Sequence, residues 1–302
     1  MKHLFRYAAL ACLSLLLLAC AAHVANSGRG PVPEKPPGTL RLATQNVHYI
    51  LLRKPTGAWS LADWEGRKGA LDDAFKALDA DAVAFQEMES FAGGDDGSVN
   101  LARDFLLDQN PGYAAAASGD WRTFPPTQPI FYRHDALRLL DQGWFFFSDT
   151  PDVIYSRTFD GSYPAFASWA QFAPAQGGPA FHVFNVHFEY KSRSNRQRSA
   201  ALVAERIASL AAGGPVFLLG DLNALAGSRT ADILAGAGLQ FAPVRGATYH
   251  FNRGINLFGA IDHIAASAGL LPVGAPVVVR SRFRGVWPSD HYPVLGDFRL
   301  PE

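Results

Sequence analysis

Six short polar clusters adjoin runs of apolar residues, and their side chains are those that metal-assisted hydrolysis of a phosphate ester needs. In chain order the clusters are Gln45-Asn46, Gln86-Glu87, Asn185-Val186-His187, Gly220-Asp221-Leu222-Asn223, Ile261-Asp262-His263 and Ser289-Asp290-His291. This chemistry uses carboxylates for a divalent ion, a base for water, and neutral or cationic donors for the phosphoryl oxygens. One cluster would mean little, but their shared position predicts one active site assembled from several strand ends.

Glu87 is the first candidate ligand of a metal ion. It directly follows the apolar run Ala82–Phe85, so we expect its side chain at a sheet edge, together with Asn46 and Asp290. Carboxylate and amide oxygens, completed by water and substrate phosphate, suit Mg²⁺, with Mn²⁺ and Ca²⁺ as alternatives. A single Glu after a strand is more often a solvated loop residue, so this prediction depends on the whole set.

The segment Gly220–Asn223 follows four apolar residues and carries a carboxylate and an amide. Asp221 and Asn223 are two residues apart and would face the same side of an extended chain. Together they can orient a water molecule and hold a phosphoryl oxygen, and Gly220 lets the backbone pass close to a ligand. Gly-Asp-x-Asn is equally good turn composition, so both interpretations remain open at this point.

His187 and His291 are candidate electrophiles. An imidazole beside a carboxylate stays partly protonated and can donate to developing negative charge. Asp262 is the expected partner of His291, where it would hold the tautomer of the ring. A lone His is more often structural, but two of them in polar clusters after apolar runs favour the catalytic interpretation.

Two groups of basic residues could attract an anionic ester to this site. The first group, after His187, is Lys191, Arg193, Arg196 and Arg198, and the second is Arg280, Arg282 and Arg284. The second group alternates, so its members would share one face of a strand. Both groups are equally consistent with solvated surfaces. For substrate contact we select Asn185, Arg133 and Arg196.

The N-terminus has the build of a bacterial export signal. Lys2 and Arg6 precede the apolar run Ala8–Ala19, which is too short to span a membrane as a mature helix. Leu17–Cys20 resembles the bacterial lipoprotein processing site, at which the Cys becomes the lipidated first residue. We therefore expect residues 1–19 to be a signal peptide and residues 20–38 to be a lipidated Cys20 with a Pro- and Gly-rich tether. Ordinary cleavage after Ala21 is the alternative.

The charge and cysteine content of the chain limit the classes of protein to which it can belong. The whole chain has 27 basic and 27 acidic residues, and removal of Lys2 and Arg6 with the signal leaves it about −2. Bulk charge would therefore not hold it to nucleic acid, which we expect only as a substrate. The two cysteines are Cys12 and Cys20, so a lipidated Cys20 leaves no thiol for a disulfide. Residues 39–302 suffice for one large domain, which we expect to be monomeric.

Hydrophobic periodicity predicts a mixture of helices and strands. Helices are expected over Glu65–Asp79, over about Val99–Gln109, and after a cap at Ser194 or Asn195. Strands are expected over Leu40–His48, Ala82–Phe85, Pro129–Arg133, Leu137–Phe147, Ala165–Phe172, Ala180–His187 and Val216–Leu219, with further strands ending at Asp262 and beginning after His291. Helices between some strands and hairpins between others predict two packed mixed sheets with helices outside.

The ordered clusters resemble the endonuclease/exonuclease/phosphatase superfamily of metal-dependent phosphoesterases over nearly all of Leu40–Leu300. The most specific segments are Val216–Asn223 (VFLLGDLN), Phe184–His187 (FNVH), Ile261–Ile264 (IDHI) and Pro288–Val294 (PSDHYPV). The resemblance implies a four-layer α-β-β-α sandwich of two packed mixed sheets.

The resemblance also implies roles for individual residues. It places Glu87 and Asn46 at the metal with Asp290 near it, has Asp221 activate water for in-line attack without a covalent enzyme intermediate, and has Asn223 hold the phosphate. His187 and His291 would stabilise the pentacovalent transition state, with Asp262 supporting His291.

Two positions depart from a bacterial branch that the segments Trp144–Pro151 and Ala167–Ala170 resemble. That branch usually has an Arg where this chain has Ala165, and a carboxylate partner for the first His where this chain has Pro126, Thr127 and Gln128. The sequence therefore predicts an exported, membrane-anchored phosphoesterase that faces the periplasm or cell surface and acts on a phosphodiester such as nucleic acid, a nucleotide or a phospholipid head group. The alternative is a non-catalytic lipoprotein that binds an anionic ligand or a protein partner.

Overall fold

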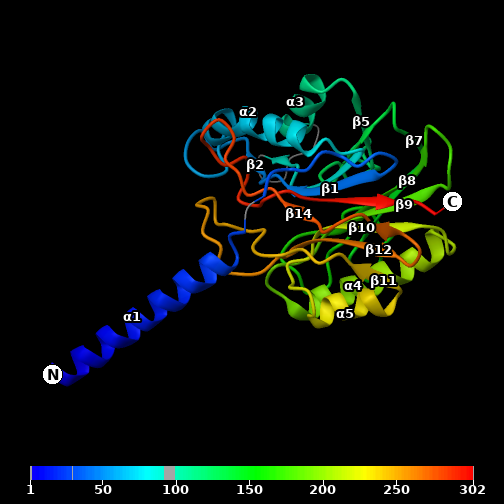
Figure 1. The fold of residues 1–302 in the computed structure, drawn as a ribbon. Helices are drawn as coiled ribbons and strands as arrows, with labels where there is room; N and C mark the ends of the chain where they lie inside the picture. The colour runs from blue at the N-terminus through cyan, green and yellow to red at the C-terminus, as the bar shows by residue number, and fades with distance from the viewer. Residues whose placement is uncertain (1, 29, 92–98, 302) are drawn as a thin grey trace.

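The computed structural model describes residues 2–28, 30–91 and 99–301. Two large sheets pack face to face, and helices cover the outer face of each (Figure 1). Both sheets contain parallel and antiparallel pairs, which confirms the predicted four-layer sandwich of two mixed sheets.

The first sheet has seven strands in the order β13-β15-β1-β3-β6-β5, with β14 paired on β15. Its central strand β1 runs parallel to β3 and antiparallel to β15. The strands are β1 (Leu40–Asn46), β3 (Ala82–Gln86), β5 (Tyr113–Ala116), β6 (Ile130–Arg133), β13 (Leu271–Pro272), β14 (Val277–Val278) and β15 (Val294–Arg299).

The second sheet has six strands in the order β11-β12-β10-β9-β8-β7, with β9 and β10 parallel. Its strands are β7 (Leu137–Phe146), β8 (Phe166–Pro174), β9 (Phe181–His187), β10 (Val216–Asp221), β11 (Leu239–Phe241) and β12 (Asp262–Ser267). A small parallel pair, β2 (Ile50–Leu51) with β4 (Ser90–Phe91), lies beyond the ends of β1 and β3.

Alternating side chains on each central strand reach two different cores, because successive residues of a strand point to opposite faces. In the first sheet Leu42 and Ala84 belong to the core between the sheets, whereas Ala43 and Val83 belong to the core under the outer helices. The second sheet divides in the same way. Both faces of these strands are therefore buried, which is why their sequences read as continuous apolar runs.

Four helices cover the sheets: α2 (Leu61–Leu78) and α3 (Leu101–Gln109) over the first, and α4 (Arg193–Leu210) and α5 (Arg229–Gly236) over the second. A polar side chain begins each one by accepting from a backbone amide of the first turn, as Ser60 does from Asp63 N in α2. The cap of α4 is Ser192, which accepts from Asn195 N, so the predicted caps at Ser194 and Asn195 were wrong. Asn195 is instead buried within the helix, where it accepts a hydrogen bond from the Ser199 hydroxyl.

The polar clusters meet at one end of the sandwich. In the first sheet Asn46 pairs with Gln86, and in the second His187 pairs with Asp221, so the ends of two parallel pairs lie at one edge. The prediction that a strand ends at Asp262 was wrong. β12 begins there because it is antiparallel to β10 and places its first residue opposite Asp221.

A hydrogen-bond cluster around Asn185 joins the two sheets beside this edge. The Asn185 amide nitrogen donates to the carbonyls of Phe85, at 2.8 Å, and Gln128, at 3.1 Å, and its oxygen accepts from the Gln86 amide at 2.7 Å. Asn185 and these three partner residues are all buried, so their polar groups depend on one another for hydrogen bonds. This cluster holds the end of β3 against the end of β9.

The substitution Asn185→Leu should lower the free energy of unfolding by roughly 2–4 kcal/mol, because it removes the buried hydrogen bonds that Asn185 makes with the Phe85 and Gln128 carbonyls and with the Gln86 amide. Urea unfolding followed by tryptophan fluorescence measures the change. Gln109→Leu, at an exposed amide on α3, is the matched control and should change stability by less than about 0.5 kcal/mol. Equal stability of the two variants would contradict this account of Asn185.

The N-terminal helix α1 (Lys2–Ala25) projects away from the sandwich. Its C-terminal end joins the domain on the side where the polar strand ends meet (Figure 1). No helix in the described part of the chain is long and apolar enough to cross a membrane. The expectation of an extended tether from residue 21 was wrong for Ala21–Ala25, which continue the helix. The residues after it are hydrogen-bonded to the domain.

Candidate active site

A cavity of about 550 Å³ opens where the polar strand ends meet. The predicted residues that line it are Glu87, His187, Asp221, Asn223, Asp290 and His291. Asn46 and Asp262 lie directly behind them, where Asn46 donates to Glu87 and Asp262 contacts His291. The fold thus brings together all eight residues for which the sequence predicted a catalytic or metal-binding role.

Glu87 and Asp290 are two carboxylates without a strong cationic partner. Burial, and then the negative charge of Asp290, raise the pKa of Glu87 above its usual value. Burial acts in the same direction on Asp290, but the positive charges of His291, His48 and His250 outweigh it and lower the pKa of that carboxyl. Within the described residues neither carboxylate forms an ion pair with a Lys or Arg. This donor set fits a divalent cation, since two half-buried carboxylates close together without a Lys or Arg partner are otherwise costly.

Arg67 positions these ligands, although the sequence analysis did not select it. Its guanidinium donates to the carbonyls of Val47 at 2.7 Å, His48 at 2.5 Å and Pro288 at 3.0 Å, and it pairs with Asp63. Arg67 therefore ties Val47 and His48, which directly follow Asn46, to the segment that leads to Asp290. The available signal was its helical spacing from Trp64 and Leu71, which places a charged residue on the buried face of α2.

Asp221 ends β10 in a tight turn. Asn223 has φ 46°, donates its backbone N–H to Asp221 Oδ1 at 2.8 Å, and donates its side-chain amide to Phe188 O at 2.9 Å. Of the two interpretations left open for this segment, the turn is the one that the structure shows, and it places both residues at the cavity. Gly220, at φ 143°, is required because a Cβ would collide with the backbone of Val186 on β9, and not because of a ligand.

The environment of Asp221 favours a proton acceptor. Burial, reinforced by the negative charge of Asp262, raises the pKa of Asp221 to about 6, against the opposing effect of His291 and His187. A carboxylate with a pKa nearer neutrality is a stronger base than an exposed one and is still ionised at pH 7.

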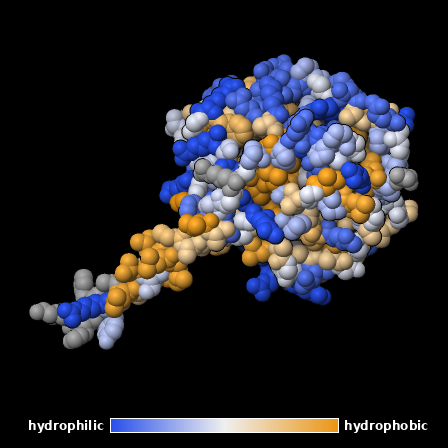
Figure 2. Space-filling view, in the orientation of Figure 1, coloured by the Kyte–Doolittle hydropathy of each residue, from blue (hydrophilic) through white to orange (hydrophobic). Residues whose placement is uncertain are grey.

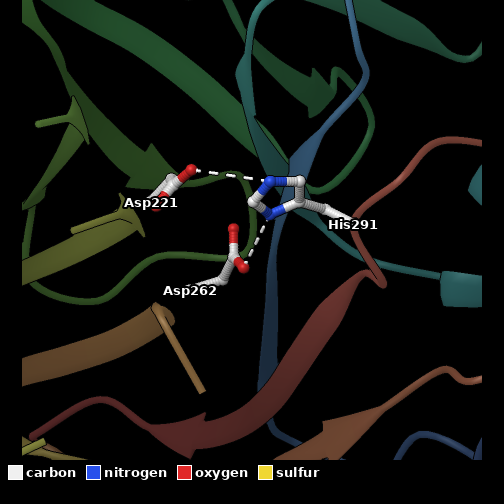
Figure 3. A group of neighbouring side chains, drawn as sticks. All are labelled: Asp221, Asp262 and His291. Carbon is white, nitrogen blue, oxygen red and sulfur yellow. Dashed lines mark hydrogen bonds and ion pairs between the residues drawn. The ribbon is translucent and has the colours of Figure 1, made fainter. Parts of the chain in front are cut away.

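The two histidines have different charge states. Although burial opposes it, the charge and hydrogen bond of Asp262 raise the pKa of His291 well above its usual value. Asp262 Oδ2 lies 2.9 Å from His291 Nδ1, and Asp221 Oδ2 lies 3.8 Å from the other ring nitrogen (Figure 3). In contrast, burial lowers the pKa of His187 despite the charge of Asp221. This shift runs against the partial protonation expected for His187, whose Nε2 lies beyond hydrogen-bond distance of Glu87 and Asp221, at 3.8 and 3.7 Å.

Asp221, Asp262 and His291 also offer donor atoms within 4.8 Å of one another, a spacing that could enclose a metal ion. We interpret them instead as a charged group in which Asp262 is hydrogen-bonded to His291 Nδ1 and Asp221 lies within ion-pair distance of the other ring nitrogen (Figure 3). Glu87 and Asp290 have no such partner and remain the better metal ligands.

A profile of the Endonuclease/Exonuclease/phosphatase family matches residues 43–291, which includes every residue of this cavity. The chain belongs to this family.

Solved structures agree with the family assignment. An endonuclease/exonuclease/phosphatase family protein from Bacteroides thetaiotaomicron is 25% identical, with a TM-score of 0.71 over 87% of this chain and 98% of its own. A mannosyl-6-phosphatase from the same organism is 26% identical, with a TM-score of 0.70 over 86% and 99%. The human Nocturnin catalytic domain, at 16% identity and a TM-score of 0.61 over 87% and 95%, shares the fold. No protein in a curated collection matches the chain.

In this family member the three residues selected for substrate contact lie elsewhere. Arg133 is at the far end of β6, where it pairs with Asp79 and lines a different cavity, because β6 runs antiparallel to β3 and away from the site. Asn185 is fully buried in the inter-sheet cluster. Arg196 donates to the carbonyls of Glu189 and Tyr190, which positions the loop after His187.

The second basic group does not form the predicted strand face. Arg280 is buried and donates to backbone carbonyls, Arg282 covers the Trp287 ring, and Arg284 pairs with Asp73 on α2. Regular strand pairing in this region ends at Val278, so the alternation in sequence has no counterpart in one face.

Aromatic rings form the walls of the cavity, a feature that the sequence analysis missed. Tyr49 and Trp59 stack with centroids 6.0 Å apart and planes 9° apart, and Phe91 lies against Tyr49. Tyr163, Tyr190 and Tyr249 also line the cavity. No Lys or Arg is present among the described lining residues. These rings are scattered along the chain, so no local pattern could have predicted their convergence.

The substitution Asp262→Asn should lower the pKa of His291, because it removes the charged partner while the burial remains. Histidine-selective NMR titration of the metal-free protein measures it. His182, whose pKa burial lowers at the opposite end of β9, should not move and serves as the internal control. If the titration of His291 were unchanged, Asp262 could not be the group that keeps it charged.

Proposed function

We propose that this protein is a divalent-metal-dependent phosphoesterase in which Asp221 activates the attacking water. The observation that carries the proposal is the convergence, in one aromatic-walled cavity, of a buried carboxylate of raised pKa with an oppositely charged His291 and a neutral His187. A base and two hydrogen-bond donors of this kind are what an in-line displacement at phosphorus requires.

The chain's own residues divide the reaction between them. Asp221 takes one proton from the attacking water as the water oxygen bonds to phosphorus. The bond to the leaving oxygen breaks on the opposite side, and the leaving oxygen takes a proton from solvent water. The His291 imidazolium, held by Asp262, and the His187 N–H donate to the phosphoryl oxygens, and Asn223 orients the phosphate. A divalent ion held by Glu87, Asn46 and Asp290 would neutralise negative charge on the phosphoryl group.

We favour Mg²⁺ as the ion and a phosphodiester as the substrate. A diester carries a single negative charge, which suits a cavity whose described lining residues include no Lys or Arg. The stacked Tyr49 and Trp59 would offer a planar surface to a base or sugar ring. The likeness to a mannosyl-6-phosphatase supports a sugar phosphate monoester as the second candidate.

The same proposal places the mature protein outside the cytoplasm. Cys20 would carry the lipid and hold the domain at a membrane that faces the periplasm or cell surface, and the domain would act as a monomer. The support is the N-terminal sequence, in which Lys2 and Arg6 precede an apolar run that ends at Cys20.

The substitution Asp221→Ala should lower kcat/KM by a factor of about 10²–10⁴, because the attacking water loses its general base. The assay is kcat/KM with Mg²⁺ on bis-nitrophenyl phosphate, nucleic acid, sphingomyelin, mannose 6-phosphate and inositol phosphates, which also ranks the substrate classes. Asp104→Ala, at an exposed carboxylate on α3, is the control and should retain activity. A wild-type protein that turns over none of these would favour the non-catalytic binding protein, and an active Asp221→Ala would rule out the proposed base.

Metal binding should depend on Glu87. Glu87→Gln is expected to weaken Mg²⁺ affinity at least about tenfold, measured by calorimetry without substrate, because a charged ligand becomes a neutral one. Glu65→Gln, at an exposed carboxylate of α2, provides the comparison and should bind like the wild type. Unchanged affinity in Glu87→Gln would move the metal site elsewhere, with the group of Asp221, Asp262 and His291 as the next candidate.

A further inference from the structure

An exposed apolar surface adjoins the mouth of the cavity. It belongs to residues 249–258, here called the apolar loop, in which Phe251, Ile255 and Phe258 are 37%, 38% and 54% exposed. Phe251 lies against Tyr249 of the cavity wall, with ring centroids 4.5 Å apart, and 6.1 Å from Phe258. Exposed apolar side chains grouped in this way on a soluble domain mark a contact surface.

The apolar loop is held in this shape by its own hydrogen bonds. The His250 ring accepts from Gly254 N at 3.2 Å, and His250 O accepts from Arg253 N at 3.0 Å. Phe251 and Asn252 are kept at φ 58° and 54°, a conformation unfavourable for residues other than glycine. The rings are thus presented outward by a constrained turn.

The N-terminal segment is attached to the same loop. The buried Asn256 donates its backbone N–H to the His23 ring at 3.1 Å and its side-chain amide to Ser27 Oγ at 2.8 Å. Next to it, Ala247 N donates to Asn26 O at 3.1 Å, and the buried Arg280 guanidinium donates to Gly28 O. Residues 23–28 therefore do not act as a free tether, because four hydrogen bonds from Ala247, Asn256 and Arg280 attach them to the domain.

This attachment fixes where Cys20 lies relative to the cavity. Cys20 precedes His23 by three residues of continuous helix, a rise of about 5 Å. The apolar surface of α1 (Figure 2) belongs mainly to residues before Cys20, which lipidation would remove, so Cys20 would become the first residue of the mature chain. A lipid on Cys20 would place the bilayer surface within a few side-chain lengths of the apolar loop.

We infer that the apolar loop docks into the surface of the lipid bilayer beside the N-terminal anchor, so that the cavity opens at the membrane. The inference rests on the proposed lipidation of Cys20. The anchor would hold the domain next to the bilayer, where burial of the exposed side chains of the apolar loop adds a second contact that orients the cavity. Arg253, exposed between Phe251 and Ile255, suits the anionic head groups of such a surface.

Depth-dependent quenching in vesicles tests this docking. The full chain would carry Phe258→Cys, be exported and lipidated, be labelled with a thiol-reactive fluorophore, and be reconstituted in phosphatidylethanolamine–phosphatidylglycerol vesicles. With Cys12 removed in the signal and Cys20 acylated, the introduced thiol is the only one that reacts. Leu271→Cys is the control, because Leu271 is 63% exposed on β13, which pairs with the far end of β15.

Nitroxide-labelled lipid should quench the label at position 258 several-fold more than at position 271, and aqueous iodide should show the reverse order. Adding Phe251→Ser and Ile255→Ser to the labelled variant should abolish the difference while the protein still sediments with vesicles, which separates docking from anchoring. Equal lipid quenching at positions 258 and 271 would overturn the inference. It would also be overturned if the lipidated protein did not sediment with vesicles, or if position 258 were shielded from iodide without being quenched by the labelled lipid. Hydrolysis of a soluble diester by the same sample reports the catalytic proposal separately.

Discussion

The Asn185 amide is the interaction on which the site depends. It joins β3 of one sheet to β9 of the other, and these strands end at Gln86 and His187. A sandwich of two sheets has no covalent element that fixes the relative position of the strand ends, and apolar packing tolerates sliding. A set of buried hydrogen bonds is directional, so it sets one relative position and brings both groups of functional residues to a common cavity.

The second constraint is the charge that this arrangement concentrates. Glu87, Asp221, Asp262 and Asp290 meet around the cavity, where burial raises the pKa of Glu87 and Asp221. Within the described chain the balancing charge comes from His291, with Arg67 fully occupied by Asp63 and three carbonyls. An environment of this kind favours a bound cation and supplies a base near neutrality, so the same electrostatic cost that weakens the fold prepares the chemistry.

The cavity walls and the N-terminal segment place this chemistry in a particular setting. Aromatic rings, with no Lys or Arg among the described lining residues, favour a substrate of low charge with a planar or ring-shaped group. The apolar loop next to Tyr249 is hydrogen-bonded to His23 and Ser27, so the end of α1 is held beside the mouth of the cavity. The position of the chain on a membrane would thereby set the direction from which substrate enters.

The sequence by itself determined the layers and the core of the site. Apolar runs and helical spacing predicted the strands and helices because burial patterns are local, and Asp221, Asp262 and His291 were predicted because each adjoins a buried strand. Only the tertiary structure decided the features that depend on strand direction and on burial among distant residues. Antiparallel pairing carried Arg133 to the opposite end, and the Asn185 amide was used between the sheets. Burial left His187 neutral, and rings from distant segments formed the walls, since pKa values and cavities depend on neighbours that no local pattern reveals.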